Sequence, residues 1–573
     1  MDLLENLNEQ QKQAVLHTEG PLLVLAGAGS GKTRVLTHRI AYLIKEKGVY
    51  PGNVLAITFT NKAAREMKER VEKLLGDLSE NIWVGTFHSI CVRILRKDIE
   101  KIGFERNFVI FDTEDQLKLI KDCLKELNLN EKIFPPKMVL EMIGKAKDEL
   151  IEPETYSNMY SSDFRLGKVA KAYSLYQKRL KQNNALDFDD IILFTIKLLM
   201  DNPPVLKYYQ QKFKYILVDE YQDTNTAQYH LVSLLAHASR NLCVVGDDDQ
   251  SIYGWRGANI RNILDFEKEF KDCKVIRLEQ NYRSSRNILD AANNVIKNNT
   301  GRKKKTLWTQ NPEGCKIQYY RGGNEHEEAM FVASEIRKLV VNEKRSYNNF
   351  AVLYRMNAQS RVLEEMFMRE GIPYRIYGGL RFYDRKEIKD IIAYLRVVLN
   401  PSDEIALKRI INVPRRGIGN ATLDTAEQIA RDKGLSIFSV ISSSDEIEEL
   451  RRASSKLQSF VDLINRFRAL KDSMTISELI QEVIEQSGIL PELEAEKTED
   501  AQSRIENIKE FVSVAIEFEA QSDEQTLEAF LANISLVTDI DEYEEEKESV
   551  AMMTFHSAKG LEFPVVFMVG MEE

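Results

Sequence analysis

Short runs of apolar residues, each followed by a stretch with helical spacing, recur along the first part of the chain. The run at 22–25 precedes a helix that begins near Lys32, and the run at 54–57 precedes a helix over 61–75. Runs that are apolar at every position are typical of strands buried on both faces. We therefore predict an α/β fold in which helices cover both faces of a parallel sheet. Later strands of this sheet are predicted at 215–218, 242–245 and 275–278.

A long helical stretch interrupts this first alternation. Between about residue 93 and residue 213 the strand signal nearly disappears, and a turn is expected at Pro135-Pro136. Because strands of the same sheet are predicted on both sides, we interpret this stretch as a helical insertion into the first α/β domain.

The same pattern repeats in a second unit that begins after Ser284. A second helical stretch, from about 385 to 540, separates its strands and is predicted to be another insertion. The acidic run 541–548 at the end of this stretch is expected to be a solvated loop. The strands of the second unit are predicted at 317–320, 350–353, 550–553 and 564–567.

Composition limits the function without naming it. No apolar run approaches the ~20 residues that span a bilayer, and the acidic N-terminus does not resemble a secretory signal. The five cysteines form no C-x-x-C pair, so neither a disulfide framework nor a zinc site is indicated. A net charge of −10 argues against holding nucleic acid by bulk charge, so such binding would depend on local positive groups. We expect a protein of the cytosol with no membrane contact.

The segment between the first run and the first helix carries the clearest chemical signal. Its glycines would let backbone N–H groups wrap a β-phosphate, Lys32 would reach the β- and γ-phosphates, and Thr33 would offer a hydroxyl to Mg²⁺. The alternative, a glycine-rich turn that caps a helix, is disfavoured by the strand–loop–helix context. The segment reads Ala26, Gly27, Ala28, Gly29, Ser30, Gly31, Lys32 and Thr33, a phosphate-loop pattern with Ala26 in place of the usual first glycine.

Two acids follow the strand predicted at 215–218. Asp219 would hold Mg²⁺ through water, and Glu220 would orient and deprotonate the attacking water. The alternative is that these are two acids without a catalytic role at an exposed strand end. The phosphate loop upstream makes this alternative less favoured. These elements predict a nucleotide hydrolase, but they do not separate motors from kinases, GTPases or transporters.

Longer motifs narrow this prediction. In their content and order they make the chain resemble superfamily 1 DNA helicases of the UvrD/PcrA branch, over essentially its whole length. The motifs are T-F-T-N-K-A-A-R-E-M (58–67), G-T-F-H-S (85–89), V-D-E-Y-Q-D-T-N (218–225), V-G-D-D-D-Q-S-I-Y-G-W-R-G-A (245–258), L-E-Q-N-Y-R-S (278–284), A-V-L-Y-R-M-N-A-Q-S-R (351–361), G-G-L-R-F-Y-D-R-K-E-I-K-D (378–390), N-V-P-R-R-G-I-G (412–419) and T-F-H-S-A-K-G-L-E-F-P-V-V (554–566).

The resemblance implies two RecA-like P-loop motor domains, each with a mainly helical insertion. The first motor domain would comprise 1–92 and 190–284, with its insertion at 93–189. The second would comprise 285–384 and 549–573, with an insertion at 385–548 that contacts duplex DNA. ATP would lie between the two motor domains and pull them together.

The resemblance also implies roles around the nucleotide. Gln11 would read the adenine edge, and Tyr282 would stack on the adenine ring, with Arg34 beside the nucleotide. Gln250 would contact the γ-phosphate, Arg283 would act as an arginine finger, and Glu562 would reach the ribose. The catalytic set implied is Lys32, Asp219, Glu220, Gln250 and Arg283, with Thr33 and Asp219 on Mg²⁺.

For DNA, the resemblance selects aromatic and polar positions. Aromatic rings can stack on any base and so grip a strand without reading its sequence. Core packing is the alternative for each ring, but the neighbours of Trp255 favour stacking. The base-stacking positions are Phe59, Phe188, Tyr253 and Trp255. The polar contacts to the strand are Thr86, His88, Arg256, Arg355, Asn357 and His556, and the backbone-binding loop for duplex DNA carries Arg415 and Arg416.

The function predicted is an ATP-dependent helicase and translocase that moves 3′→5′ on single-stranded DNA and unwinds duplexes in repair and plasmid replication. Its expected partners are single-stranded DNA, junctions with duplex, and replication or repair proteins, for a monomer or weak dimer in the bacterial cytosol or nucleoid. The family continues past the last strand into a motif with another arginine, so we expect the chain to be a fragment. One alternative is therefore a fragment that binds ATP and DNA with weak or no unwinding. Another is a P-loop ATPase acting on a small molecule or protein, without stimulation by DNA.

Overall fold

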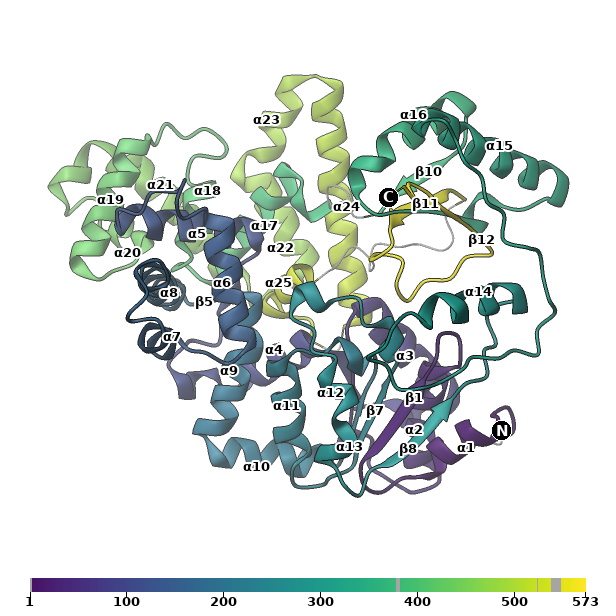
Figure 1. The fold of residues 1–573 in the computed structure, drawn as a ribbon. Helices are drawn as coiled ribbons and strands as arrows, with labels where there is room; N and C mark the ends of the chain where they lie inside the picture. The colour runs from purple at the N-terminus through teal and green to yellow at the C-terminus, as the bar shows by residue number, and fades with distance from the viewer. Residues whose placement is uncertain (1–2, 378–381, 523, 537–547, 573) are drawn as a thin grey trace.

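Two parallel sheets organise the computed structural model, which describes residues 3–377, 382–522, 524–536 and 548–572 (Figure 1). In the first sheet every neighbouring pair of strands is parallel. The predicted parallel α/β fold is therefore confirmed. The order of strands is β3 (Trp83–Thr86), β2 (Val54–Thr58), β6 (Tyr215–Val218), β7 (Leu242–Gly246), β1 (Leu22–Ala26) and β8 (Lys274–Leu278).

Alternate residues of these strands supply two apolar cores, one on each face. Leu22 and Val24 of β1 pack into one core, whereas Leu23 and Leu25 pack into the other. This burial on both faces explains why β1 and its neighbour β7 are apolar at every position, whereas the edge strand β8 carries Lys274 and Arg277. The first core is covered by α1 (Glu9–Leu16), α2 (Lys32–Lys45) and α3 (Asn61–Leu75), and the second by α4 (Phe87–Asp98), α9 (Phe188–Asp201), α10 (Pro203–Lys212), α11 (Thr226–Ala236), α12 (Arg261–Leu264) and α13 (Phe266–Glu269).

The first insertion is helical, as predicted, with one addition. Two short strands, β4 (Val109–Ile110) and β5 (Ala185–Leu186), pair in parallel where the chain enters and leaves it. Helices α4 and α9 are continuous across the boundaries expected at 92/93 and 189/190. Pro136 begins a helix, where its missing N–H costs nothing. The helices are α5 (Thr113–Glu126), α6 (Pro136–Asp148), α7 (Pro153–Met159) and α8 (Phe164–Gln182).

The second sheet has four described strands, again all parallel. The strand predicted at 317–320 is wrong, because that segment is irregular. Its side chains explain the error: Ile317 is 62% exposed and Tyr319 is 86% exposed, so β propensity has no burial to support it. The strands, in order, are β10 (Tyr374–Ile376), β11 (Val550–Thr554), β9 (Phe350–Tyr354) and β12 (Val565–Met568), with helices α14 (Arg286–Ile296), α15 (Glu325–Glu343) and α16 (Ser360–Glu370) in the same part of the chain.

The second insertion shares its apolar core with the first. Buried residues between 109 and 185 and between 388 and 534 form one continuous cluster, and α5 lies beside α18 (Figure 1). Asn400 Nδ2 donates to Asn183 O over 2.8 Å, and Arg396 lies 2.5 Å from Asp115. The helices are α17 (Lys386–Leu399), α18 (Glu404–Ile410), α19 (Asn420–Lys433), α20 (Ile437–Ser442), α21 (Ser454–Leu470), α22 (Ile476–Ser487), α23 (Ile489–Glu496), α24 (Glu499–Gln521) and α25 (Leu527–Ser535).

Two features of the sequence fall wholly or partly outside the described residues. They are the start of the motif at 378–390 and nearly all of the acidic run 541–548. Within the helices that are described, none has the length and apolar character needed to cross a bilayer.

Candidate functional site

The phosphate loop connects the end of β1 to the first turn of α2. Gly29 and Gly31 have φ of +62° and +83°, a region that glycine enters without strain. Ser30 Oγ donates to Gly27 O over 2.7 Å, which closes the loop on itself. A Cβ on Gly27 would collide with the side chain of Leu307. Since α2 begins at Lys32, the free N–H groups of its first turn lie at the loop, a favourable position for a phosphate.

The two predicted acids lie directly beside this loop. Lys32 Nζ is 3.0 Å from Glu220 Oε1, and Thr33 Oγ1 donates to Asp219 Oδ2 over 3.5 Å. Glu220 has a left-handed backbone, with φ of +50°, which is uncommon outside glycine and often found at functional sites. The hydroxyl of Thr33 and the carboxylate of Asp219 are hard oxygen ligands of the kind Mg²⁺ takes, so the residues present fit that ion.

The pKa values of these two carboxyl groups are shifted in opposite directions. Burial raises the pKa of Asp219 to about 7, and the negative charge of Glu220 adds to this effect. Burial acts in the same direction on Glu220, but Lys32 and Lys559 outweigh it and lower the pKa of this carboxyl. At neutral pH Glu220 therefore keeps its charge, as a general base must.

The residues predicted at the adenine side converge on the other edge of the loop. Gln11 Nε2 donates to Ser30 O over 3.0 Å, and Tyr282 N donates to Gly29 O over 2.9 Å. Asn8 caps α1 and also donates from Nδ2 to Tyr282 Oη over 2.8 Å. Arg34 lies exposed in the first turn of α2.

Asn281 contacts the phosphate loop, and the sequence analysis did not predict this role. Its Nδ2 donates to Ala28 O over 2.7 Å, and its Oδ1 accepts from the backbone N–H groups of Arg283 and Ser284. It thereby ties the segment that carries the predicted arginine finger to the phosphate loop. Its position between Gln280 and Tyr282 in the motif at 278–284 could have indicated this role.

Two predicted residues, Gln250 and Arg283, meet the loop between β11 and β12 of the second sheet. Arg283 Nε lies 2.5 Å from Glu562 Oε2. Lys559 Nζ donates to Gln250 O over 2.7 Å and also binds Asp223. Lys559 was not predicted, although it lies between His556 and Glu562 in the same motif. The β11–β12 loop therefore contacts both the acids of the first sheet and its arginine segment.

Five residues of the predicted strand-binding set form one cluster that again joins the two sheets. Tyr253 Oη donates to His556 O over 3.0 Å, and the rings of Trp255 and His556 lie 5.7 Å apart. Arg256 lies 4.6 Å from the Trp255 ring, and Arg355 Nη1 is 3.4 Å from His556 Nδ1. Trp255 is 62% exposed, so its ring is open to a stacking partner instead of being buried in a core.

A second group of predicted residues surrounds the start of α4. Phe59 packs on Phe87, with ring centroids 5.4 Å apart. Thr86 caps α4 by accepting from Ser89 N. The half-buried ring of His88 lies 6.0 Å from that of Phe188, which begins α9, and burial lowers the pKa of His88 to about 4.

Three more predicted residues lie at loops away from these clusters. Asn357 is exposed at the end of β9. Arg415 is exposed, whereas Arg416 is half-buried and its guanidinium turns inward. The Arg416 guanidinium donates to Tyr394 Oη over 2.6 Å and to four backbone carbonyls, of residues 410, 413, 414 and 487. Its donors are thus used to hold the loop itself.

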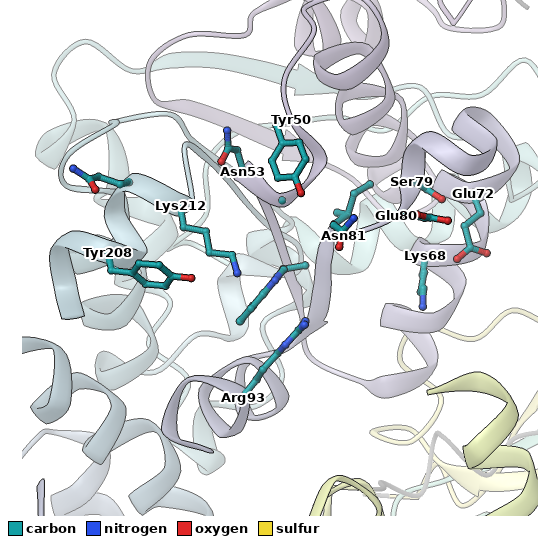
Figure 2. A pocket seen from close by; sticks show the side chains of 14 residues that line it. Tyr50, Asn53, Lys68, Glu72, Ser79, Glu80, Asn81, Arg93, Tyr208 and Lys212 are labelled. Carbon is teal, nitrogen blue, oxygen red and sulfur yellow. The ribbon is translucent and has the colours of Figure 1, made fainter. Parts of the chain in front are cut away.

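A surface hollow of about 880 Å³ lies elsewhere, beside the edge strand β3 (Figure 2). Its lining includes Tyr50, Tyr208, Arg93 and Lys212, and the last two lie 4.0 Å and 4.1 Å from the ring of Trp83. None of the predicted site residues lines it, so it is separate from the phosphate loop.

Comparison with known proteins adds an independent finding. The UvrD/REP helicase N-terminal domain matches residues 7–271, and the UvrD-like helicase C-terminal domain matches residues 276–573. The chain is 55% identical to the ATP-dependent DNA helicase PcrA of Bacillus subtilis (strain 168). It is 54% identical to PcrA of Staphylococcus aureus (strain Mu50) and 53% identical to PcrA of Staphylococcus epidermidis (strain RP62A). Each alignment covers 100% of this chain and 78% of the relative.

Proposed function

The chain belongs to the UvrD-like family of DNA helicases, and from that premise we propose that it uses ATP to move 3′→5′ on single-stranded DNA and to unwind duplexes in repair and replication. The two parallel sheets fit two RecA-like motor domains. The observation that carries the proposal is the β11–β12 loop, which contacts Asp223 and Glu220 through Lys559 and the stacking cluster through His556.

For hydrolysis, we assign Lys32 and Glu220 linked roles. Their side chains form an ion pair of 3.0 Å, in which each charge neutralises the other. Phosphate oxygens offer Lys32 a stronger set of acceptors, so ATP binding draws it from Glu220. The freed carboxylate can orient a water and accept its proton. A Mg²⁺ ion held by Thr33 and Asp219 would neutralise charge on the phosphate oxygens.

Arg283 and Gln250 would respond to the γ-phosphate from two sides. Arg283 is exposed and can leave Glu562 for a phosphoryl oxygen, where a positive charge stabilises the transition state. Gln250 lies on the turn that Lys559 binds. Gln11 and Tyr282 would contact the base, with Arg34 and Glu562 nearer the sugar and phosphates.

Coupling to DNA would pass through Lys559. Its ammonium binds Asp223 beside the acids and lies 5.2 Å from the Tyr253 ring in the stacking cluster. A cleft that closes on ATP would therefore move Tyr253, Trp255 and His556 together. Repeated closing and opening would shift the strand past the rings, with Phe59, Phe188 and the polar set as further contacts.

For the domain division we propose the ranges 1–92 with 190–284, and 285–384 with 549–573, for the two motor domains. The insertions are 93–189 and 385–548, and the second would contact duplex DNA at a junction through Arg415. The family also suggests replication or repair proteins as partners and the bacterial cytosol or nucleoid as the place of action.

ATP hydrolysis with and without single-stranded DNA tests this function. We expect turnover to rise at least about tenfold when DNA is added, as coupling of the two sites requires. Well-folded protein whose ATPase ignores DNA would contradict the motor and favour a P-loop ATPase with another substrate.

A further inference from the structure

The segment 302–311, between α14 and α15, runs along the nucleotide site and makes contacts that no predicted role uses. We call it the strap. Leu307 packs on Gly27 of the phosphate loop. Trp308 N donates to Glu279 O over 3.0 Å, and Asn281 N donates to Trp308 O over 2.7 Å. The strap therefore touches both the phosphate loop and the arginine segment.

The strap also inserts Lys305 among three consecutive aspartates after β7. Lys305 Nζ lies 2.7 Å from Asp247 and 3.0 Å from Asp249, and it also binds Asp248. Its side chain is only 2% exposed. Burial opposes its charge, but Asp247 and Asp248 outweigh burial and raise the pKa of the Lys305 ammonium. The position that a cation would take between these carboxylates is thus filled by the protein itself.

Arg302 completes the cluster. It binds Asp249 through two bonds, of 2.6 Å and 2.5 Å, and also donates to Lys305 O over 3.1 Å. Three carboxylates therefore face two cations, an excess of one negative charge. Loss of either cation would leave a buried carboxylate without its partner, which is costly in a site of low polarity.

The cluster is joined to the proposed γ-phosphate sensor through Asp247. One oxygen of this carboxylate faces Lys305, and the other accepts from Gln250 Nε2 over 2.7 Å. This bond fixes one N–H of the Gln250 amide, and its second N–H can donate to a phosphate oxygen. The orientation of the sensor therefore depends on a lysine of the strap.

We propose that Lys305 is a positioning residue that, through Asp247, holds Gln250 ready to recognise the γ-phosphate, so that the strap joins the sensor to the arginine segment. The proposal rests on the function proposed above. It predicts that loss of Lys305 harms recognition of ATP more than recognition of ADP, because ADP has no γ-phosphate to sense.

The test compares Lys305→Met with Lys303→Met in the full chain. Lys303 lies on the same strap, but its ammonium binds Glu267, so its loss removes the same charge without touching Asp247. Affinities for a fluorescent non-hydrolysable ATP analogue and for fluorescent ADP are measured with Mg²⁺. We expect K305M to bind the ATP analogue about tenfold more weakly than K303M, the effect of a lost charge-assisted bond. Affinity for ADP should change by less than about threefold.

A second variant separates positioning from stability. Asp248→Asn in the K305M background restores the excess of one negative charge, so the melting temperature should recover while the ratio of ATP to ADP affinity stays low. Recovery of that ratio, or equal ratios in K305M and K303M, would overturn the proposal. If DNA does not stimulate the ATPase of the wild-type protein, the proposed function is contradicted. The affinities of K305M and K303M for the ATP analogue and for ADP would still test the role of Lys305.

Discussion

Lys32 of the phosphate loop and Glu220 at the end of β6 form an ion pair of 3.0 Å. A phosphate that competes for the lysine would free the carboxylate for its proposed role. Because both side chains are largely shielded from water, with exposures of 11% and 24%, this exchange involves groups that interact strongly.

Replacing Glu220 with Gln should stop hydrolysis while leaving ATP bound. The amide keeps the shape of the side chain but cannot accept the proton of water, so turnover should fall about 10²–10⁴-fold. Steady-state ATPase and fluorescent nucleotide binding measure the two effects. Glu19→Gln is the control, since Glu19 binds Tyr215 at the opposite end of the same strand. ATPase within about threefold of wild type would exclude Glu220 as the base.

Replacing Trp255 with Ala should weaken binding of single-stranded DNA and leave nucleotide binding intact. A stacked base contributes about 1–3 kcal/mol, which corresponds to about 5- to 150-fold in affinity. Fluorescence anisotropy with labelled oligothymidine measures it. Because Trp255 is 62% exposed, the melting temperature should not move. Tyr319→Ala, another exposed aromatic, is the control, and equal DNA affinity for the two variants would contradict the stacking role.

The neighbouring arginines of the second insertion should behave differently. Arg415→Ala should reduce affinity for a duplex junction without changing the melting temperature. Arg416→Ala should destabilise the protein by about 2–4 kcal/mol, because five acceptors, several of them backbone carbonyls, lose a donor. Thermal melts and junction binding distinguish them. A stable R416A variant that has lost junction binding would reverse this assignment.

His88 should make stability depend on pH between about 6.5 and 4. Its pKa is lowered from 6.5 to about 4 by burial, so the unfolded state binds the proton first as pH falls. Its stabilising contribution is present above pH 6.5 and is lost as pH falls through 4. After allowance for solvent screening of a half-buried ring, we expect about 1–2 kcal/mol.

Melting at pH 7 and pH 4.5 of wild type and His88→Phe checks this sign. The variant keeps an aromatic ring against Phe188 but cannot be protonated, so its melting temperature should fall less between the two pH values. An equal fall would assign the pH dependence to other groups.

Central strands of the first sheet, such as β1, were predictable because burial on both faces makes them apolar at every position. The edge strand β3 was not predicted. Strand β10 was missed because its three residues are only half-buried and include Arg375. The pair β4 and β5 has two residues per strand, too few for a periodicity. At 317–320 a strand was predicted where the structure has none. The residues there favour a strand by type, but no layer of side chains covers them.

The site residues followed from motifs, but their partners did not. Nothing in two adjacent arginines says that Arg416 turns inward while Arg415 stays exposed. Lys305 lies far along the chain from Asp247, and only the fold brings them to 2.7 Å. Sequence reasoning thus identified the groups that meet ligands, whereas the contacts that hold those groups in place required the structure.

The core shared by the two insertions has a mechanical consequence. Parting them would expose apolar surface to water at about 25 cal/mol per Å², so a load that DNA places on one insertion passes to the other through packed side chains. The pair acts as a single unit, which the chain enters and leaves at β4 and β5 on the side of the first sheet, and after β10 and before β11 on the side of the second sheet. A relative rotation of the two sheets must therefore deform this unit or change its angle to one of the sheets.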